Sequence, residues 1–175
     1  MLILSYATKD QKYLDYADRL IQNFADVNYQ DYKIIYYPPH NNKWTGCNIK
    51  PTFILEQLSE YKQKLLIIDI DSVIKNTPKK IINPTNFDIG FVFTPELKNP
   101  ITNGIHLWNF TDNTIMFLKR WKELCDDKSL PKLDHHKLIQ TVNEFKYKMN
   151  LINIRKDISS WFVAELNYNN SHITF

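Results

Sequence analysis

Apolar segments of strand length alternate with amphipathic helical segments along most of the chain. Residues 2–7 form a short apolar run, and an apolar set then recurs at helical spacing: Tyr13, Ala17, Leu20, Ile21 and Phe24. Because parallel strands are joined by crossover connections that are usually helices, this order predicts an α/β fold with a mostly parallel central sheet flanked by helices. The other predicted strands are residues 33–37, 65–68, 89–93, 105–110, 151–154 and 161–166, and the other predicted helices begin near Pro51, at Thr111 or Asp112, and near Asp134.

The chain is long enough for one domain with a substantial core. Its 175 residues correspond to about one domain of roughly 150 residues. Hydrophobic residues make up 43% of the chain, which excludes an intrinsically disordered protein. No internal repeat or flexible linker divides the sequence, so we expect residues 1–175 to form a single domain.

Composition also narrows the classes of ligand and the location. Three glycines are too few for a glycine-rich phosphate loop, and a net charge of +3 without a basic block predicts no nucleic-acid partner. Cys47 and Cys125 have neither the spacing of metal ligands nor the density of a disulfide scaffold. The apolar start of the chain is too short for a signal peptide or a membrane span. We therefore expect reduced thiols and a soluble, cytoplasmic protein without a transmembrane segment.

The motif with the clearest chemistry is a pair of aspartates directly after an apolar strand. Residues 65–68 are Leu-Leu-Ile-Ile, and Asp69 and Asp71 follow with the spacing that places both on the same side of an extended chain. Two neighbouring carboxylates repel each other unless a cation lies between them, and Mg²⁺ or Mn²⁺ prefers such oxygen ligands. The motif therefore predicts a metal site for a phosphate-bearing ligand, and the alternative is a solvated strand end whose acids cap the next turn.

Phosphatases of the haloacid dehalogenase type use a similar strand end, with the first aspartate as nucleophile. The segment Asp69-Ile-Asp-Ser-Val fits that motif. These enzymes usually carry it on their first strand, however, whereas two predicted strands and a predicted helix precede Asp69 here. The acidic pair Asp126-Asp127 follows a predicted helix and not a buried strand. This class is kept as an alternative function.

The segments that flank the motif resemble the metal-dependent nucleotide-sugar glycosyltransferases of the GT-A fold. That family has a Lys-Pro helix start before the Asp-x-Asp strand, and several short segments follow it in a set order. The resemblance implies a Rossmann-like GT-A domain. The matching segments are residues 50–58 (Lys-Pro-Thr-Phe-Ile-Leu-Glu-Gln-Leu), 88–90 (Asp-Ile-Gly), 103–105 (Asn-Gly-Ile), 117–121 (Phe-Leu-Lys-Arg-Trp) and 134–135 (Asp-His).

The resemblance implies roles on the nucleotide side of the site for residues in three segments. The end of the first strand would hold the base and ribose, Lys50 would face the donor phosphates, and Asp71 would be the principal ligand of Mn²⁺ or Mg²⁺. Asp69 would contact the ribose or the metal. The strand-end residues are Tyr6, Ala7 and Thr8. Strand-end packing and a solvated lysine are the alternatives without function.

On the sugar side, the resemblance implies that Asn103 and Gly104 lie beside the donor sugar. Asp134 would hydrogen-bond sugar hydroxyls and is the candidate general base, with His135 next to it where the family more often has Gln. The alternatives are a turn before a strand and a helix N-cap. His172 is the late candidate for a third metal or phosphate ligand, whereas the remaining histidines are interpreted as loop or surface residues: His40, His106 and His136.

The function that follows from the resemblance is transfer of a monosaccharide from a UDP- or GDP-sugar to a hydroxyl of a glycan, glycoprotein or glycolipid. The metal would stabilise the charge that develops on the departing diphosphate. A second hypothesis is a sugar-nucleotide-binding domain without turnover, working beside a partner polypeptide.

Overall fold

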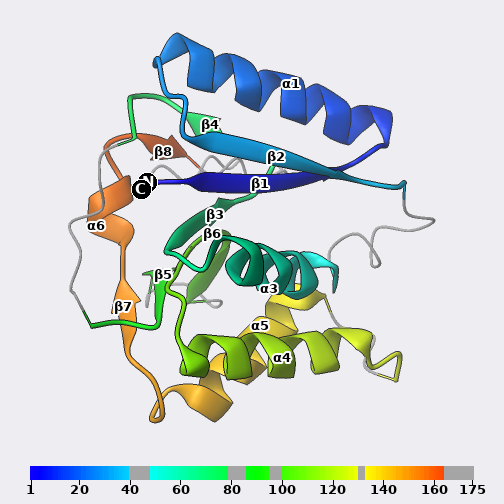
Figure 1. The fold of residues 1–175 in the computed structure, drawn as a ribbon, viewed down its shortest axis with the longest axis vertical. Coiled ribbons are helices and arrows are strands. Elements are labelled where there is room, and N and C mark those ends of the chain that lie inside the picture. Colours follow the sequence, from blue (N-terminus) through cyan, green and yellow to red (C-terminus); the bar gives the residue numbers. More distant parts are fainter. Residues whose placement is uncertain (40–47, 79–85, 95–99, 130–132, 164–175) are drawn as a thin grey trace.

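The chain folds as a six-stranded sheet with helices on both faces (Figure 1). The computed structural model describes residues 1–39, 48–78, 86–94, 100–129 and 133–163. The strands are β1 (Ile3–Thr8), β2 (Tyr32–Tyr37), β3 (Leu65–Ile68), β4 (Val73–Ile74), β5 (Ile89–Phe93), β6 (Ile101–Trp108), β7 (Leu151–Asn153) and β8 (Phe162–Val163). The helices are α1 (Gln11–Asp26), α3 (Lys50–Tyr61), α4 (Asp112–Asp126), α5 (Asp134–Phe145) and α6 (Arg155–Ile158).

The strand order in the large sheet is β2-β1-β3-β6-β5-β7. β1 pairs in parallel with β2 and with β3, and β5 pairs in parallel with β7. β6 is antiparallel to both of its neighbours, β3 and β5. The predicted α/β class with a mostly parallel sheet flanked by helices is confirmed. Because β6 runs opposite to its neighbours, the beginning of β6 lies at the edge of the sheet where the parallel strands end.

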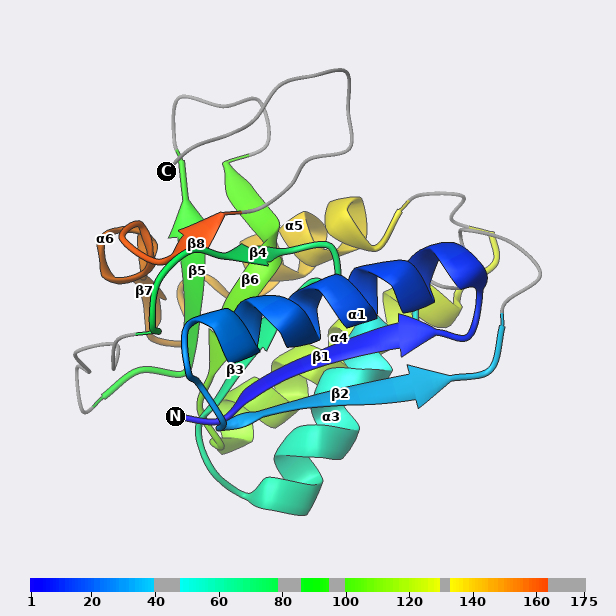
Figure 2. The ribbon, with the colours of Figure 1, turned by 90° about the horizontal axis from the view of Figure 1, so that it is seen from above.

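Each face of the sheet has its own hydrophobic core. α1 covers one face, and α3, α4 and α5 lie together on the other (Figures 1 and 2). On the first face Ala17, Leu20 and Phe24 are buried as predicted and Tyr13 is half-buried, whereas Ile21 is exposed. On the second face the core is rich in aromatic rings, including the fully buried Trp108 and Trp121.

Local sequence signals define several helix ends. Pro51 lies in the first turn of α3, where its missing N–H has no helical partner to lose. That helix ends at Lys62, whose backbone is left-handed with φ of 48°. Thr111 caps α4, because its side-chain oxygen accepts a hydrogen bond from the Thr114 N–H at 3.2 Å. The starts of α3 and α4 agree with the predicted helix starts.

β6 begins earlier than its sequence pattern predicts. We expected a strand over residues 105–110 with Asn103 and Gly104 in front of it or in a turn, but both lie inside β6. The pairing with β5 is irregular here, because Val92 is opposite Thr102 whereas the adjacent Phe91 is opposite His106. Such an irregularity bends a strand locally and often lies beside a functional site.

A second, two-stranded sheet pairs β4 with β8. β4 follows Asp71 almost directly, and neither β4 nor the short helix α6 was predicted from the sequence. The predicted strand over residues 161–166 is present as β8 at Phe162–Val163, and the rest of it lies outside the described residues. None of the helices among the described residues combines the length and apolar character that crossing a bilayer requires.

Candidate functional site

The Asp-x-Asp motif lies at the carboxyl end of β3. Backbone hydrogen bonds connect it to β6 and close a turn that starts within the motif. The Asp69 N–H donates to the carbonyl of Gly104 on β6 at 2.8 Å. The Ser72 N–H donates to the Asp69 carbonyl at 3.1 Å and closes a tight turn. Ligands of open α/β sheets bind at this carboxyl edge, so the fold places both carboxylates where a ligand can reach them.

Lys50 joins the motif from the start of α3. Its side chain is 6% exposed, and its Nζ lies 2.5 Å from Oδ1 of Asp69, whose own side chain is 36% exposed. The same Nζ donates to the Asn103 carbonyl at 2.8 Å. The structure therefore brings together three residues from α3, β3 and β6 that the sequence motifs assigned to one site.

Asp134 extends the site to the start of α5. The Asn103 Nδ2 donates to Oδ2 of Asp134 at 2.7 Å. The Asp134 side chain is buried, and burial raises the pKa of this carboxyl while the Lys50 charge and the Asn103 hydrogen bond oppose the rise. Trp121 donates from its indole Nε1 to the Asp134 carbonyl at 3.1 Å and so fixes the helix start from α4. Asp134 is thus anchored through both its side chain and its main chain.

The pKa of the Asp71 carboxyl is shifted by its surroundings. Burial and the charge of Asp69 raise its pKa to about 6, and the charges of Lys50 and Arg19 lower it in part. The repulsion between the two carboxylates is what a divalent cation would relieve, and their oxygen atoms suit Mg²⁺ or Mn²⁺. Within the described residues no three His, Cys, Asp or Glu side chains form a metal-binding group. A cation held by Asp69 and Asp71 would therefore need further ligands from outside the described residues, such as substrate, water or a residue of another part of the chain.

The predicted nucleotide-binding residues lie at the end of β1. Ala7 and Thr8 are buried, and the Thr8 hydroxyl has no hydrogen-bond partner among the described residues. The Tyr6 ring packs against Phe53 and Tyr37, with centroid distances of 5.0 and 6.0 Å. Tyr6 therefore packs with its neighbours at the sheet edge.

His135 follows Asp134 at the start of α5. Burial lowers the pKa of His135, and its Nε2 has no partner among the residues that the structure describes. An unpaired buried nitrogen is destabilising and marks a position where a ligand or a water can bind. His172 lies outside the described residues.

His106 was interpreted as a loop or surface histidine, and that prediction is wrong. It lies on β6, 1% exposed, with its ring 5.1 Å from Phe91 and 6.2 Å from Trp121. Burial lowers the pKa of His106 well below 6.5, and Lys50 and His135 lower it further. His136, by contrast, is exposed as expected. The missed signal is that His106 stands inside the apolar run Ile-His-Leu-Trp.

Replacing His106 with Gln is expected to weaken the acid sensitivity of the fold. In the unfolded chain His106 takes up a proton near its ordinary pKa of 6.5, whereas in the folded protein its pKa lies well below that value. Stability therefore falls as the pH drops below about 6.5, by up to about 2 kcal/mol at about pH 5.

Urea unfolding at about pH 8 and about pH 5 measures this contribution, since the free energy of unfolding follows from the denaturation midpoint and slope. The loss on acidification should be smaller in His106→Gln than in the wild type. His136→Gln is the matched control, because His136 is exposed. Equal losses in all three proteins would contradict the prediction.

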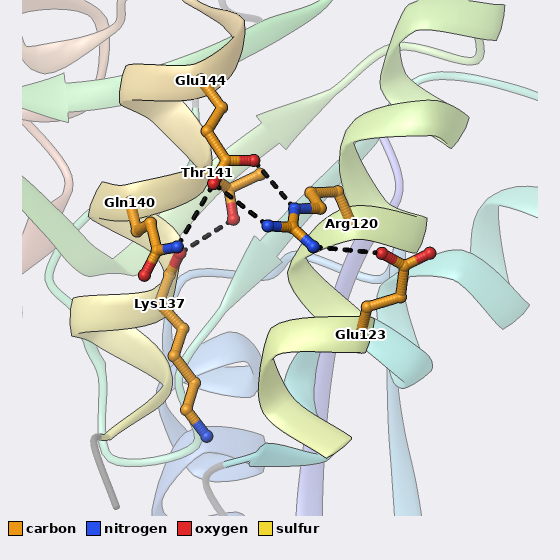
Figure 3. A network of polar contacts seen from close by, with 6 residues as sticks. All are labelled: Arg120, Glu123, Lys137, Gln140, Thr141 and Glu144. Carbon is orange, nitrogen blue, oxygen red and sulfur yellow. Dashed lines mark hydrogen bonds and ion pairs between the residues drawn. The ribbon is translucent and has the colours of Figure 1, made fainter. Parts of the chain in front are cut away.

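An ion pair between Arg120 and Glu144 joins α4 to α5 (Figure 3). Arg120 lies between Glu123 on its own helix and Glu144 on α5, with an Nε to Oε2 distance of 2.8 Å to Glu144. Gln140 adds a hydrogen bond to Glu144 at 3.2 Å. Exposed pairs of this kind contribute at most about 1 kcal/mol each, and α5 is also packed on the second core through Leu138 and Val142.

Comparisons with known proteins support the fold. No protein-family model and no curated protein sequence matches the chain. The structure is similar to a glycosyltransferase involved in the glycosylation of the major capsid of PBCV-1, with a TM-score of 0.65, 14% identity, and coverage of 97% of this chain and 95% of that one. It is also similar to the apo form of the glycosyltransferase GlyE of Streptococcus pneumoniae TIGR4, with a TM-score of 0.57, 11% identity and coverage of 86% of this chain. The chain spans 44% of the length of GlyE.

Proposed function

We propose that this chain is a glycosyltransferase that moves a monosaccharide from a nucleoside-diphosphate sugar to a hydroxyl of a glycan, glycoprotein or glycolipid. The proposal rests on the convergence of Lys50, Asp69 and Asp134 at the carboxyl edge of the sheet. These residues come from separate parts of the chain and carry the charges that a phosphate-bearing sugar donor requires. The fold, which is similar to two glycosyltransferases, is consistent with this chemistry.

Lys50 is proposed to bind the donor phosphates. Its ammonium group is held at the site by Asp69 and by the Asn103 carbonyl, at 2.5 and 2.8 Å. A buried ammonium group attracts a diphosphate strongly, because little water screens the two charges. On donor binding Lys50 would turn part of its hydrogen bonding from Asp69 to a phosphate oxygen.

Asp69 and Asp71 are proposed to hold a divalent cation, Mn²⁺ or Mg²⁺. Such a cation, when bound, acts as a Lewis acid that stabilises the negative charge of the departing nucleoside diphosphate. The chain's own contribution is to place Asp69 and Asp71 next to each other at the end of β3, where burial and the charge of Asp69 both raise the pKa of Asp71. His172 remains the proposed third ligand.

The sugar is proposed to lie between β6 and the start of α5. Asn103 and Asp134 are already bonded to each other at 2.7 Å, so their remaining polar atoms are oriented before a ligand arrives. Gly104 has no side chain to obstruct the approach of a sugar, and His135 would offer its Nε2, which has no partner among the described residues. Asp134 is the candidate base for the acceptor hydroxyl, and Tyr6, Ala7 and Thr8 would contact the base and ribose.

The test measures the product. The purified chain is incubated with UDP- or GDP-sugars, Mn²⁺ and simple glycoside acceptors, and the glycosylated acceptor is detected by mass spectrometry. We expect transfer from one donor class in the wild type and in Asp126→Asn, which removes an exposed carboxylate ion-paired with Lys122 at the end of α4. Lys50→Met should raise the KM for the donor, because it removes the buried cation.

Three other results would each reject the proposal in a different way. Release of phosphate from phosphomonoesters, lost in Asp69→Asn, would identify a phosphatase. Metal-dependent binding of a nucleotide sugar without transfer or hydrolysis would identify a binding domain, which can be followed by thermal shift because a bound ligand raises the melting temperature. Absence of binding to all donors, with or without metal, would leave the similarity to glycosyltransferases as a similarity of fold.

A further inference from the structure

Two hydrogen bonds connect the residues from Asp71 to Ile74 with α1. Arg19 donates from Nη2 to the main-chain carbonyl of Asp71 at 2.7 Å, across 52 residues of sequence. One turn further along α1, Asn23 accepts a hydrogen bond from the Ile74 N–H at 3.2 Å. Arg19 and Asn23 lie beside the buried face of α1, which packs on the sheet through Ala17, Leu20 and Phe24 and so holds the helix in place. No sequence motif pointed to Arg19.

The Arg19 guanidinium is itself restrained. Its central carbon lies 5.1 Å from the centre of the Tyr16 ring, which is within the range of a cation–π contact. Such stacking and the planar shape of the group limit the directions in which it can donate. Arg19 is therefore suited to fixing the position of one carbonyl group, and that carbonyl belongs to Asp71.

We propose that Arg19 is a positioning residue for the cation site: its hydrogen bond to the Asp71 main chain holds the Asp71 carboxylate where it can bind a divalent cation together with Asp69. This inference rests on the metal site of the proposed function. α1 supplies none of the proposed metal ligands, but through Arg19 it would control the affinity of the site for the cation. Residues that orient metal ligands typically change metal affinity by about 10- to 100-fold when replaced.

Two effects of Arg19 on a bound cation oppose each other. Its positive charge repels the cation, whereas its hydrogen bond holds the Asp71 loop in place. The proposal states that the second effect is the larger. Arg19→Met removes both the charge and the bond, and Arg19→Lys keeps the charge but replaces the planar guanidinium with a flexible ammonium group. The pair of variants therefore separates charge from geometry.

The experiment titrates Mn²⁺ alone into the full chain and follows free Mn²⁺ by electron paramagnetic resonance. We expect Arg19→Met and Arg19→Lys to weaken Mn²⁺ binding by about tenfold relative to the wild type. Lys12→Met is the matched control, because Lys12 is also on α1 and also lies over Tyr16, at 5.6 Å. Lys12→Met should bind Mn²⁺ like the wild type.

A second readout separates positioning from general destabilisation. In the transfer assay, the Mn²⁺ concentration for half-maximal rate should rise about tenfold in Arg19→Met, whereas kcat at saturating Mn²⁺ should stay within about twofold of the wild type. Melting curves without metal verify that each variant is folded. Mn²⁺ binding by Arg19→Met that is as tight as in the wild type, or tighter, overturns the role of Arg19 alone. Failure of the wild type to bind Mn²⁺ overturns the metal site and this role together.

Discussion

Replacing Asp71 with Asn is expected to lower glycosyl transfer by about 10²- to 10³-fold and to abolish metal-dependent binding of the nucleotide sugar. The carboxylate of Asp71 is the proposed principal ligand, and a neutral amide binds a hard cation much more weakly. Transfer at saturating Mn²⁺ and the metal-dependent rise in melting temperature measure the two effects. Both should be retained in Asp126→Asn, which removes a carboxylate at the end of α4.

The same substitution should not destabilise the metal-free fold. Folding raises the pKa of Asp71 from 3.8 to about 6, so the ionised carboxylate is less favourable in the folded protein than in the unfolded chain at neutral pH. Asp71→Asn removes that charge, and its melting temperature should equal or exceed that of the wild type. A large fall in melting temperature would show that the loss of activity reflects unfolding, and unchanged transfer would contradict the role of Asp71.

Replacing Trp121 with Ala is expected to destabilise the protein by about 3–5 kcal/mol, because it opens a large cavity in the core. The ring is fully buried and stacks on Trp108, with a centroid distance of 6.3 Å and an angle of 16° between the planes. Its Nε1 also donates to the Asp134 carbonyl at 3.1 Å. Urea denaturation measures the loss in the free energy of unfolding.

A second variant of Trp121 measures the indole hydrogen bond, and a variant of an exposed residue on the same helix is the control. Trp121→Phe keeps an aromatic ring but leaves the Asp134 carbonyl without its donor, so we expect a loss of about 1–3 kcal/mol and a higher KM for the donor sugar. Met116→Ala, on the same helix but 52% exposed, should change stability by less than about 0.5 kcal/mol. Wild-type stability in Trp121→Phe would show that the indole hydrogen bond contributes nothing.

The order of strands and helices could be predicted from the sequence because it depends on local hydrophobic periodicity. The run Leu65–Ile68 and the apolar face of α1 are examples, and both are buried as expected. The direction of β6 could not be predicted, because alternation of side chains is the same in parallel and antiparallel strands. The early start of β6 was missed for a related reason, since the polar residues Thr102 and Asn103 interrupt the apolar pattern.

Some residues of the candidate site could be predicted from the sequence and others could not. Lys50, Asp69, Asn103 and Asp134 were grouped by resemblance to family motifs, and the structure brings them into contact. Arg19 was missed because its partner is 52 residues away and is a main-chain carbonyl, which no side-chain motif records.

The pairing of β4 with β8 has a consequence for how the protein is made. Asn76, just after β4, donates from Nδ2 to the Ser160 carbonyl at 2.7 Å, and the two residues are 84 positions apart. The Lys75 N–H donates to the Trp161 carbonyl at 2.9 Å. On a translating ribosome, β3 and the aspartate pair emerge long before these partners. The β4–β8 pairing next to the motif can therefore form only late in synthesis, and so can the part of the first core that Trp161 and Phe162 supply.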